Sequence, residues 1–151
     1  MNWYTQITQN LAVLPDFITF YDAEIQQAKY DVAIKGNVER NLASLPGITE
    51  QRFGQLQEIE AVLNYLNIQL RKIRSTTFKK FLEGYNRALS SRDAERYTDS
   101  DADVVDMETL CNDVALLRNK WLGIMKGLES KNFMLGHVVR LRAAGMEDIT
   151  I

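Results

Sequence analysis

Apolar residues in the middle of the chain recur at three- and four-residue steps. The set is Ile59, Val62, Leu63, Leu66, Leu70 and Ile73. At about 100° per residue these side chains fall on one stripe, which is typical of a helix that buries a single face. The 151-residue sequence also holds only two prolines and many strong helix formers. It therefore predicts an all-α fold with a long central helix over residues 50–74, behind a Thr49 N-cap.

The apolar stripe changes direction beyond Ser75 and Thr77. The next apolar residues are Phe78, Phe81, Leu82, Tyr85 and Leu89, and their stripe is rotated by roughly 100° from the first. This rotation predicts either a kink in the helix or a change of packing partner near these two residues.

Two further helices are expected before the central one. Pro15 suits the first turn of a helix, and the helical pattern then continues to Asp31. Residues 37–44 are expected to form a short helix. A turn at Pro46 and Gly47 would separate it from the central helix.

The C-terminal part predicts two more helices behind a loop. Residues 90–106 are polar and acidic and are expected to form that loop. Asp103 is then the N-cap of a helix over residues 104–131, which Asn132 ends as a left-handed cap. A last helix is expected to stop at Gly145, before a loose tail.

We expect one domain over residues 1–151, since the chain has the length of a single domain. Its N-terminal helices, within residues 15–92, carry a strongly basic segment. The helices of residues 103–145 carry more apolar surface than one small bundle needs, which favours an oligomerisation region. The residues expected at this subunit interface are Trp121, Met125, Leu128, Phe133, Leu135 and Val138.

Positive charge is concentrated in one segment of a chain whose net charge is −2. Residues 71–92 hold seven basic residues and one acid, Glu83, whereas residues 93–113 hold eight acids and one base. On a helix the basic residues form a stripe on one face. Its members are Arg71, Lys72, Arg74, Lys79, Lys80 and Arg87.

The basic stripe has two interpretations. A solvated helix face is the common one. Binding to a nucleic-acid backbone is favoured by the shortage of acidic partners, by hydroxyl donors such as Ser75, and by interleaved aromatics such as Phe78 and Phe81, because single strands are bound by charge together with stacking. Those aromatics fit a core stripe equally well.

No motif of an enzyme, metal or cofactor site is found in the sequence. The lone His137 and the lone Cys111 form no recognisable catalytic or zinc pattern. Asp99, Asp101 and Asp103 have the spacing that opens a calcium loop, but the glycine and glutamate that must follow are absent. The sequence therefore predicts a protein without catalytic residues, metal or cofactor.

Gly123 and Gly127 are four residues apart on one predicted helix. Such a pair either lets a second helix approach closely or weakens its own helix by about 1 kcal/mol per glycine. The sequence leaves both alternatives open.

No apolar run approaches the roughly 20 residues that span a bilayer, and the N-terminus lacks the pattern of a signal peptide. We therefore expect a cytoplasmic protein with no membrane partner.

Short motifs over most of the chain resemble the UvsY recombination mediators of tailed bacteriophages. Near the C-terminus, "GLESKNFMLGHVVRLRA" is similar to the closing pattern of that family, through Phe133, His137 and Arg142. "LRKIR" is similar to its central basic motif, through Lys72 and Arg74. "AEIQQAKYDVAIKG" is similar to its first amphipathic segment.

The resemblance implies a recombination mediator in the cytoplasm of an infected bacterial host cell. Such proteins are not enzymes. They bind single-stranded DNA, form closed homo-oligomeric rings, and help a RecA-like recombinase to displace single-strand-binding protein. The alternative is a helical oligomeric adaptor or structural protein that does not bind DNA, in which the basic stripe meets acidic protein surfaces.

Overall fold

A computed structural model describes residues 2–84 and 89–145. About 90% of the structure is helical, and no strand occurs in those residues. The helices are α1 (Trp3–Gln9), the 3-10 helix η1 (Leu11–Val13), α2 (Leu14–Val32), α3 (Val38–Glu83), α4 (Ser91–Asp99) and α5 (Ala102–Ala143). The all-α prediction with a long central helix is confirmed.

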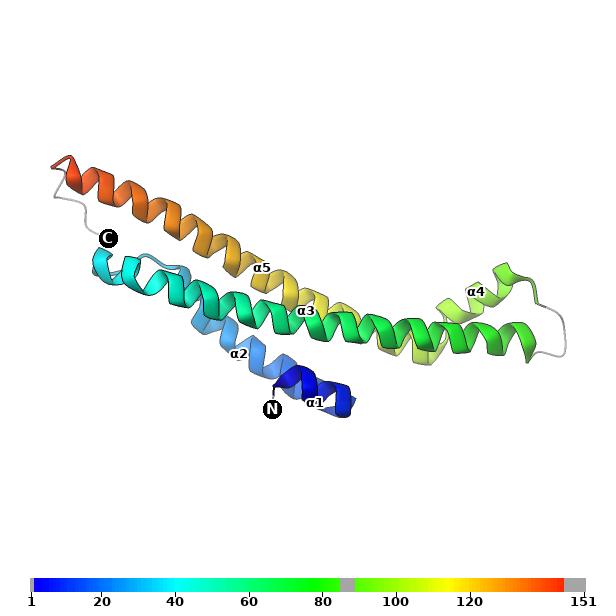
Figure 1. Ribbon diagram of the computed structural model, residues 1–151. Coiled ribbons are helices and arrows are strands. Elements are labelled where there is room, and N and C mark those ends of the chain that lie inside the picture. Colours follow the sequence, from blue (N-terminus) through cyan, green and yellow to red (C-terminus); the bar gives the residue numbers. More distant parts are fainter. Residues whose placement is uncertain (1, 85–88, 146–151) are drawn as a thin grey trace.

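Two long helices form the frame of the molecule. α3 has 46 residues and α5 has 42, so each is more than 60 Å long at about 1.5 Å per residue. Figure 1 shows them antiparallel and side by side over much of their length, with α2 along one side and α4 packed near the far end of α3. They diverge toward the end that holds the start of α3 and the end of α5.

The core lies where α2, α3 and α5 meet. The predicted stripe of α3 is in it, since Ile59, Val62 and Leu66 are fully buried. Trp121 of α5 is also fully buried, and its ring meets that of Tyr21 of α2 edge-on at 5.2 Å between centroids. Aromatic pairs in this geometry add roughly 1 kcal/mol beyond the area they bury.

Buried polar groups fix the position of α2. Arg52 of α3 is 5% exposed, and its guanidinium bonds to Glu24 at 3.0 Å and Asp31 at 2.6 Å. The Nζ atom of Lys131, on α5, donates to the carbonyl oxygen of Asp31 at 2.8 Å. Burial lowers the pKa of Lys131, and the nearby Asp31 carboxylate opposes that shift. Arg52 of α3 and Lys131 of α5 thus both bond to Asp31 in the last turn of α2.

α3 differs from the prediction at its N-terminal end. The expected short helix, the turn at Pro46 and Gly47 and the Thr49 cap are wrong, because α3 runs unbroken through Pro46 from an Asn37 N-cap. Proline inside a helix removes a hydrogen bond and crowds the preceding turn, at a cost of about 3 kcal/mol. Leu45 is 5% exposed in the core, and this burial offsets the cost.

The other end of α3 is also unbroken. The helix passes through Ser75 and Thr77 without interruption to Glu83. The packing partner changes there instead, because the Phe81 ring lies 5.5 Å from the Tyr97 ring of α4. Of the two alternatives predicted for this region, the change of partner is the one observed.

The prediction of an acidic loop over residues 90–106 is wrong, because Ser91–Asp99 form α4 and α5 already begins at Ala102. Ser90 caps α4 by accepting from the Asp93 amide, and Ala94 and Thr98, four residues apart, are buried. A serine followed three residues later by an acid is a local N-terminal signal that could have indicated this helix.

α5 begins and ends close to the predicted limits but has no internal break. Its N-cap is Asp101 rather than Asp103. The predicted cap at Asn132 is wrong, because Lys131 and Leu135 on either side are buried and hold the helix in place. Gly145, with φ of +83°, follows the last turn as predicted. The expected tail at residues 146–151 lies outside the described residues.

Candidate functional site

Four cations of the basic stripe lie exposed on the last turns of α3. Arg71, Lys72, Lys79 and Lys80 are all in the exposed class, and no ion pair is found for them within residues 2–84 and 89–145. We call these four residues the cationic face. Arg87, the sixth predicted member, lies outside the described residues.

Arg74 differs from the other members of the stripe. Its guanidinium forms ion pairs with Asp99 of α4 at 2.5 Å and with Glu108 of α5 at 3.0 Å. The hydrogen bond that this guanidinium donates to the Asp99 carboxylate is the main cause of the raised pKa of Arg74. The acidic segment of this chain therefore binds one of its own basic residues, and Arg74 is less available to an external anion than its neighbours.

Hydroxyl groups and acids border the cationic face. Ser75 is exposed between Arg71 and Lys79, so these three residues follow one another at four-residue steps, about 6 Å apart along α3. On the side of α5, Asp103 and Asp106 line a shallow groove together with Lys72. An anion on this face is thus attracted most strongly away from α5.

The aromatics expected among the charges do not face solvent in the predicted way. Phe78 is half-buried, and Phe81 packs on Tyr97. Tyr85 lies outside the described residues. Ile68 and Leu82, which are 41% and 36% exposed, are the apolar residues beside the cationic face. Stacking on aromatic rings is therefore not supported by the positions of Phe78 and Phe81.

Cys111 and His137 are too far apart to react together. Both are on α5, and their 26-residue separation in the sequence corresponds to about 39 Å along the helix. Burial, with a smaller contribution from Glu108, raises the pKa of the Cys111 thiol, so the thiol form is favoured. In the described part of the chain, no three His, Cys, Asp or Glu residues gather as metal ligands.

The residues expected at a subunit interface fall into two groups. Trp121, Leu128 and Leu135 are at most 1% exposed, because they pack in the core of their own chain. Their side chains are buried within their own chain, so their assignment as exposed interface residues is corrected; of the three, Leu128 lies at the base of a groove described below. Phe133, in contrast, is 68% exposed, and Met125 and Val138 are half-buried. For these three the interface stays a prediction.

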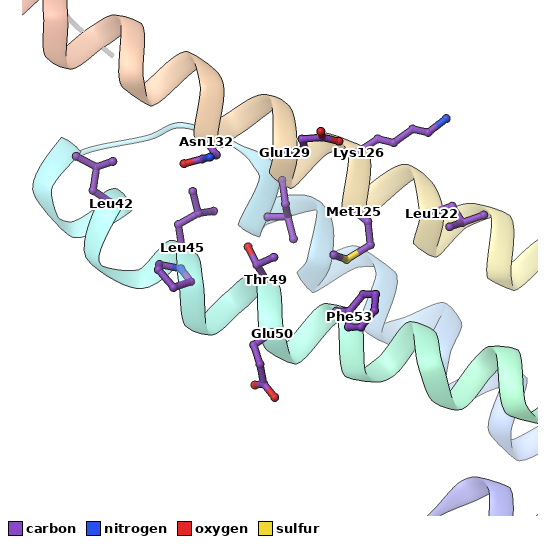
Figure 2. Close-up of a pocket in the computed structure, with 12 residues that line it drawn as sticks. Leu42, Leu45, Thr49, Glu50, Phe53, Leu122, Met125, Lys126, Glu129 and Asn132 are labelled. Atoms are coloured by element: carbon purple, nitrogen blue, oxygen red, sulfur yellow. The ribbon is translucent and has the colours of Figure 1, made fainter.

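A second candidate site lies where α3 and α5 diverge. An apolar groove of about 800 Å³ opens there, and we call it the α3–α5 groove. Figure 2 shows Leu45, Thr49 and Met125 pointing into the space between the two helices. This groove was not predicted from the sequence, because residues 37–49 were expected to form a separate short helix and a turn.

The glycine pair of α5 has one close contact, on another side of that helix. A β-carbon on Gly127 would stand 2.7 Å from Cγ1 of Val32 in α2, whereas Gly123 has open space around it. Close approach of a second helix is thus the correct alternative for Gly127 alone.

None of the helices in the described part of the chain has the length and apolar character of a membrane span. No family model, curated protein or solved structure matches the chain. The resemblance to UvsY mediators consequently stays a prediction.

Proposed function

We propose that this protein binds the phosphate backbone of single-stranded DNA through the cationic face of α3. The observation that carries the proposal is the exposure of Arg71, Lys72, Lys79 and Lys80 without ion pairs in the described residues. Cations without ion pairs give up mainly water and counterions when they meet a phosphate, so they bind polyanions at little cost. Lys80 also has a contact within its own helix, because its Nζ atom lies 5.8 Å from the centroid of the Phe81 ring.

Binding of this kind does not read sequence. The side chains of the cationic face are long and flexible. Their lysine ammonium groups and arginine guanidinium group contact phosphates, which are the same at every nucleotide. Ser75 offers a hydroxyl donor among them. The exposed aliphatic side chains of Ile68 and Leu82 add apolar contact for unstacked bases, which a duplex does not present.

The proposed cellular role is that of a non-enzymatic recombination mediator. In this role the protein forms a closed homo-oligomer on single-stranded DNA, displaces single-strand-binding protein and loads a RecA-like recombinase. Repeating one modest cationic face in each subunit converts weak contacts into tight collective binding. This part of the proposal rests on the resemblance of Phe133, His137, Arg142 and the basic motif to the UvsY family.

Fluorescence anisotropy of a labelled single strand at low salt tests the proposed site. The variant Arg71→Ala/Lys72→Ala should bind at least about tenfold more weakly than the wild type. The control variant Lys29→Ala/Lys35→Ala removes the same charge from exposed positions elsewhere and should bind within about twofold of the wild type. Equal losses in both variants would mean that only net charge matters, and the site assignment would be wrong.

One observation favours a second candidate function, an adaptor that binds no DNA. Asp99 and Glu108 pair with Arg74, which shows that the acidic segment can satisfy basic residues of this protein. Under this alternative, the cationic face pairs with acidic protein surfaces. It predicts no binding of single strands at low salt and assemblies that dissociate at high salt.

A further inference from the structure

The α3–α5 groove is a place in the helical bundle where one more helix could pack between α3 and α5. α2 packs against α5 on the side of Gly127. Met125 and Glu129, which line the groove, lie about half a turn of α5 away from that side. From Leu42 to Phe53 the groove follows 12 residues of α3, whose ends are about 16 Å apart. An amphipathic helix of about three turns fits this length.

The groove is apolar within and mainly acidic at its edges. Leu45 and Leu128 are buried at its base, and Phe53, at 51% exposure, and Leu42, at 37%, leave apolar surface uncovered. The charged residues along it are Glu50, Glu129 and Lys126. The occupant that this surface favours is a helix with an apolar stripe and flanking positive charge.

The last three turns of α5 provide such a helix. Phe133, Met134 and Leu141 are 68%, 50% and 42% exposed, and with His137 they fall within about 100° of one helical face. The Phe133 and His137 rings are in edge-on contact at 4.6 Å, which places them on one face. We call these four residues the α5 stripe.

Arginines flank the α5 stripe. Arg140 and Arg142 are exposed, and no ion pair is found for them, for Glu50 or for Glu129 in the part of the chain that the structure describes. The charges of the stripe and the groove are therefore opposite and both available.

The stripe cannot fill the groove of its own chain. The stripe and one wall of the groove belong to α5, which is one continuous helix from Ala102 to Ala143, and the stripe begins directly after Asn132 at the end of the groove. Reaching back would require α5 to break between buried Lys131 and buried Leu135. The complementary surface has to come from another molecule.

We propose that the α3–α5 groove binds the α5 stripe of a second copy of this chain. Phe133 and Leu141 enter the apolar part of the groove, and Arg140 and Arg142 meet the carboxylates of Glu50 and Glu129. The groove and the stripe are different surfaces, so copies either exchange stripes in pairs or continue into a closed ring. This contact rests on the proposed function, because it would be the subunit interface of the proposed homo-oligomer. It forms without DNA.

Sedimentation velocity without nucleic acid, over a range of protein concentrations, tests the contact. The wild type should associate, and either Phe133→Glu or Leu42→Glu should raise the dissociation constant at least about tenfold, because a charge would enter an apolar site. All of these positions are exposed, so the variants should keep the helical circular dichroism of the wild type. The control Leu116→Glu, at a 58% exposed site of α5 outside groove and stripe, should associate like the wild type.

Charge reversal makes the test independent of any loss of fold. Glu50→Lys/Glu129→Lys and Arg140→Glu/Arg142→Glu should each be monomeric alone, and an equimolar mixture should associate again. A monomeric wild type overturns the proposal, as does a mixture that stays monomeric. DNA binding is then measured on the monomeric Phe133→Glu variant, so failure of the contact and failure of the proposed DNA site are read separately.

Discussion

Replacing Gly127 with alanine probes the close contact between α5 and α2. The added β-carbon would stand 2.7 Å from Cγ1 and 3.0 Å from Cγ2 of Val32, whereas carbon atoms prefer about 3.5–4.0 Å. Val32 is half-buried in the last turn of α2, and its short branched side chain has little freedom to move away. Overpacking of this kind costs about 1–3 kcal/mol.

Alanine also removes a glycine from the interior of α5, which gains about 1 kcal/mol. Gly123, one turn earlier, has open space around its α-carbon, so Gly123→Ala gains that amount without overlap. The difference in free energy of unfolding between the two variants isolates the packing cost. We expect Gly127→Ala to be less stable than Gly123→Ala by about 1–3 kcal/mol, or roughly 2–12 °C in melting temperature for a chain of this size.

Urea unfolding followed by far-UV circular dichroism, at one protein concentration for all variants, measures this difference. In a Val32→Ala background the overlap is gone, and Gly127→Ala should then stabilise the protein as Gly123→Ala does. Equal stability of Gly127→Ala and Gly123→Ala in the wild-type background would refute the close approach of α2 to α5.

Two further predictions concern buried polar groups. Burial, together with the hydrogen bond to Glu58, raises the pKa of Tyr21. The unfolded chain therefore loses this proton first as the pH rises above about 10, and stability falls there by up to about 1.4 kcal/mol per pH unit. Urea unfolding between pH 9 and 11 (roughly the range bracketing that value) should show a shallower fall for Tyr21→Phe, and identical slopes would contradict the assignment. Arg52→Ala should cost about 3 kcal/mol, because it leaves carboxylates unpaired around a buried site, whereas Arg74→Ala, at a partly exposed ion pair, should cost less than about 1 kcal/mol. Similar losses for the two arginines would mean that burial of Arg52 does not set its contribution.

Patterns that depend on local sequence predicted much of this fold. The apolar stripe of the central helix, the proline in the first turn of α2 and the glycine after α5 all act within a few residues, and each is observed. The N-terminal signal of α4 at Ser90 was also local. It was not used, because the acidic composition of the segment favoured a loop.

The errors occur where burial outweighs local preference. Pro46 and Asn132 both predict a helix end, yet both lie inside helices, because Leu45, Lys131 and Leu135 beside them are buried. The partners of these residues come from other helices, and a single sequence does not show which helices will meet.

The candidate site was only partly predictable, because some of its features depend on which helices meet. The exposed cations of α3 follow from helical spacing. The ion pairs of Arg74 were not predictable, because they join residues 25 and 34 positions apart in the sequence. The α3–α5 groove depends on the divergence of two helices, which no local pattern encodes.

The salt dependence of single-strand binding measures how many cations of α3 contact phosphates. Each cation that binds a phosphate of a single strand contributes about −0.7 to the slope of log Kobs against log salt. If Arg71, Lys72 and Lys79 all contact phosphates, Arg71→Ala/Lys72→Ala/Lys79→Ala should reduce the magnitude of the wild-type slope by about 2 per bound copy. A wild-type protein that binds no single strand, or equal slopes for the two proteins, would contradict the account.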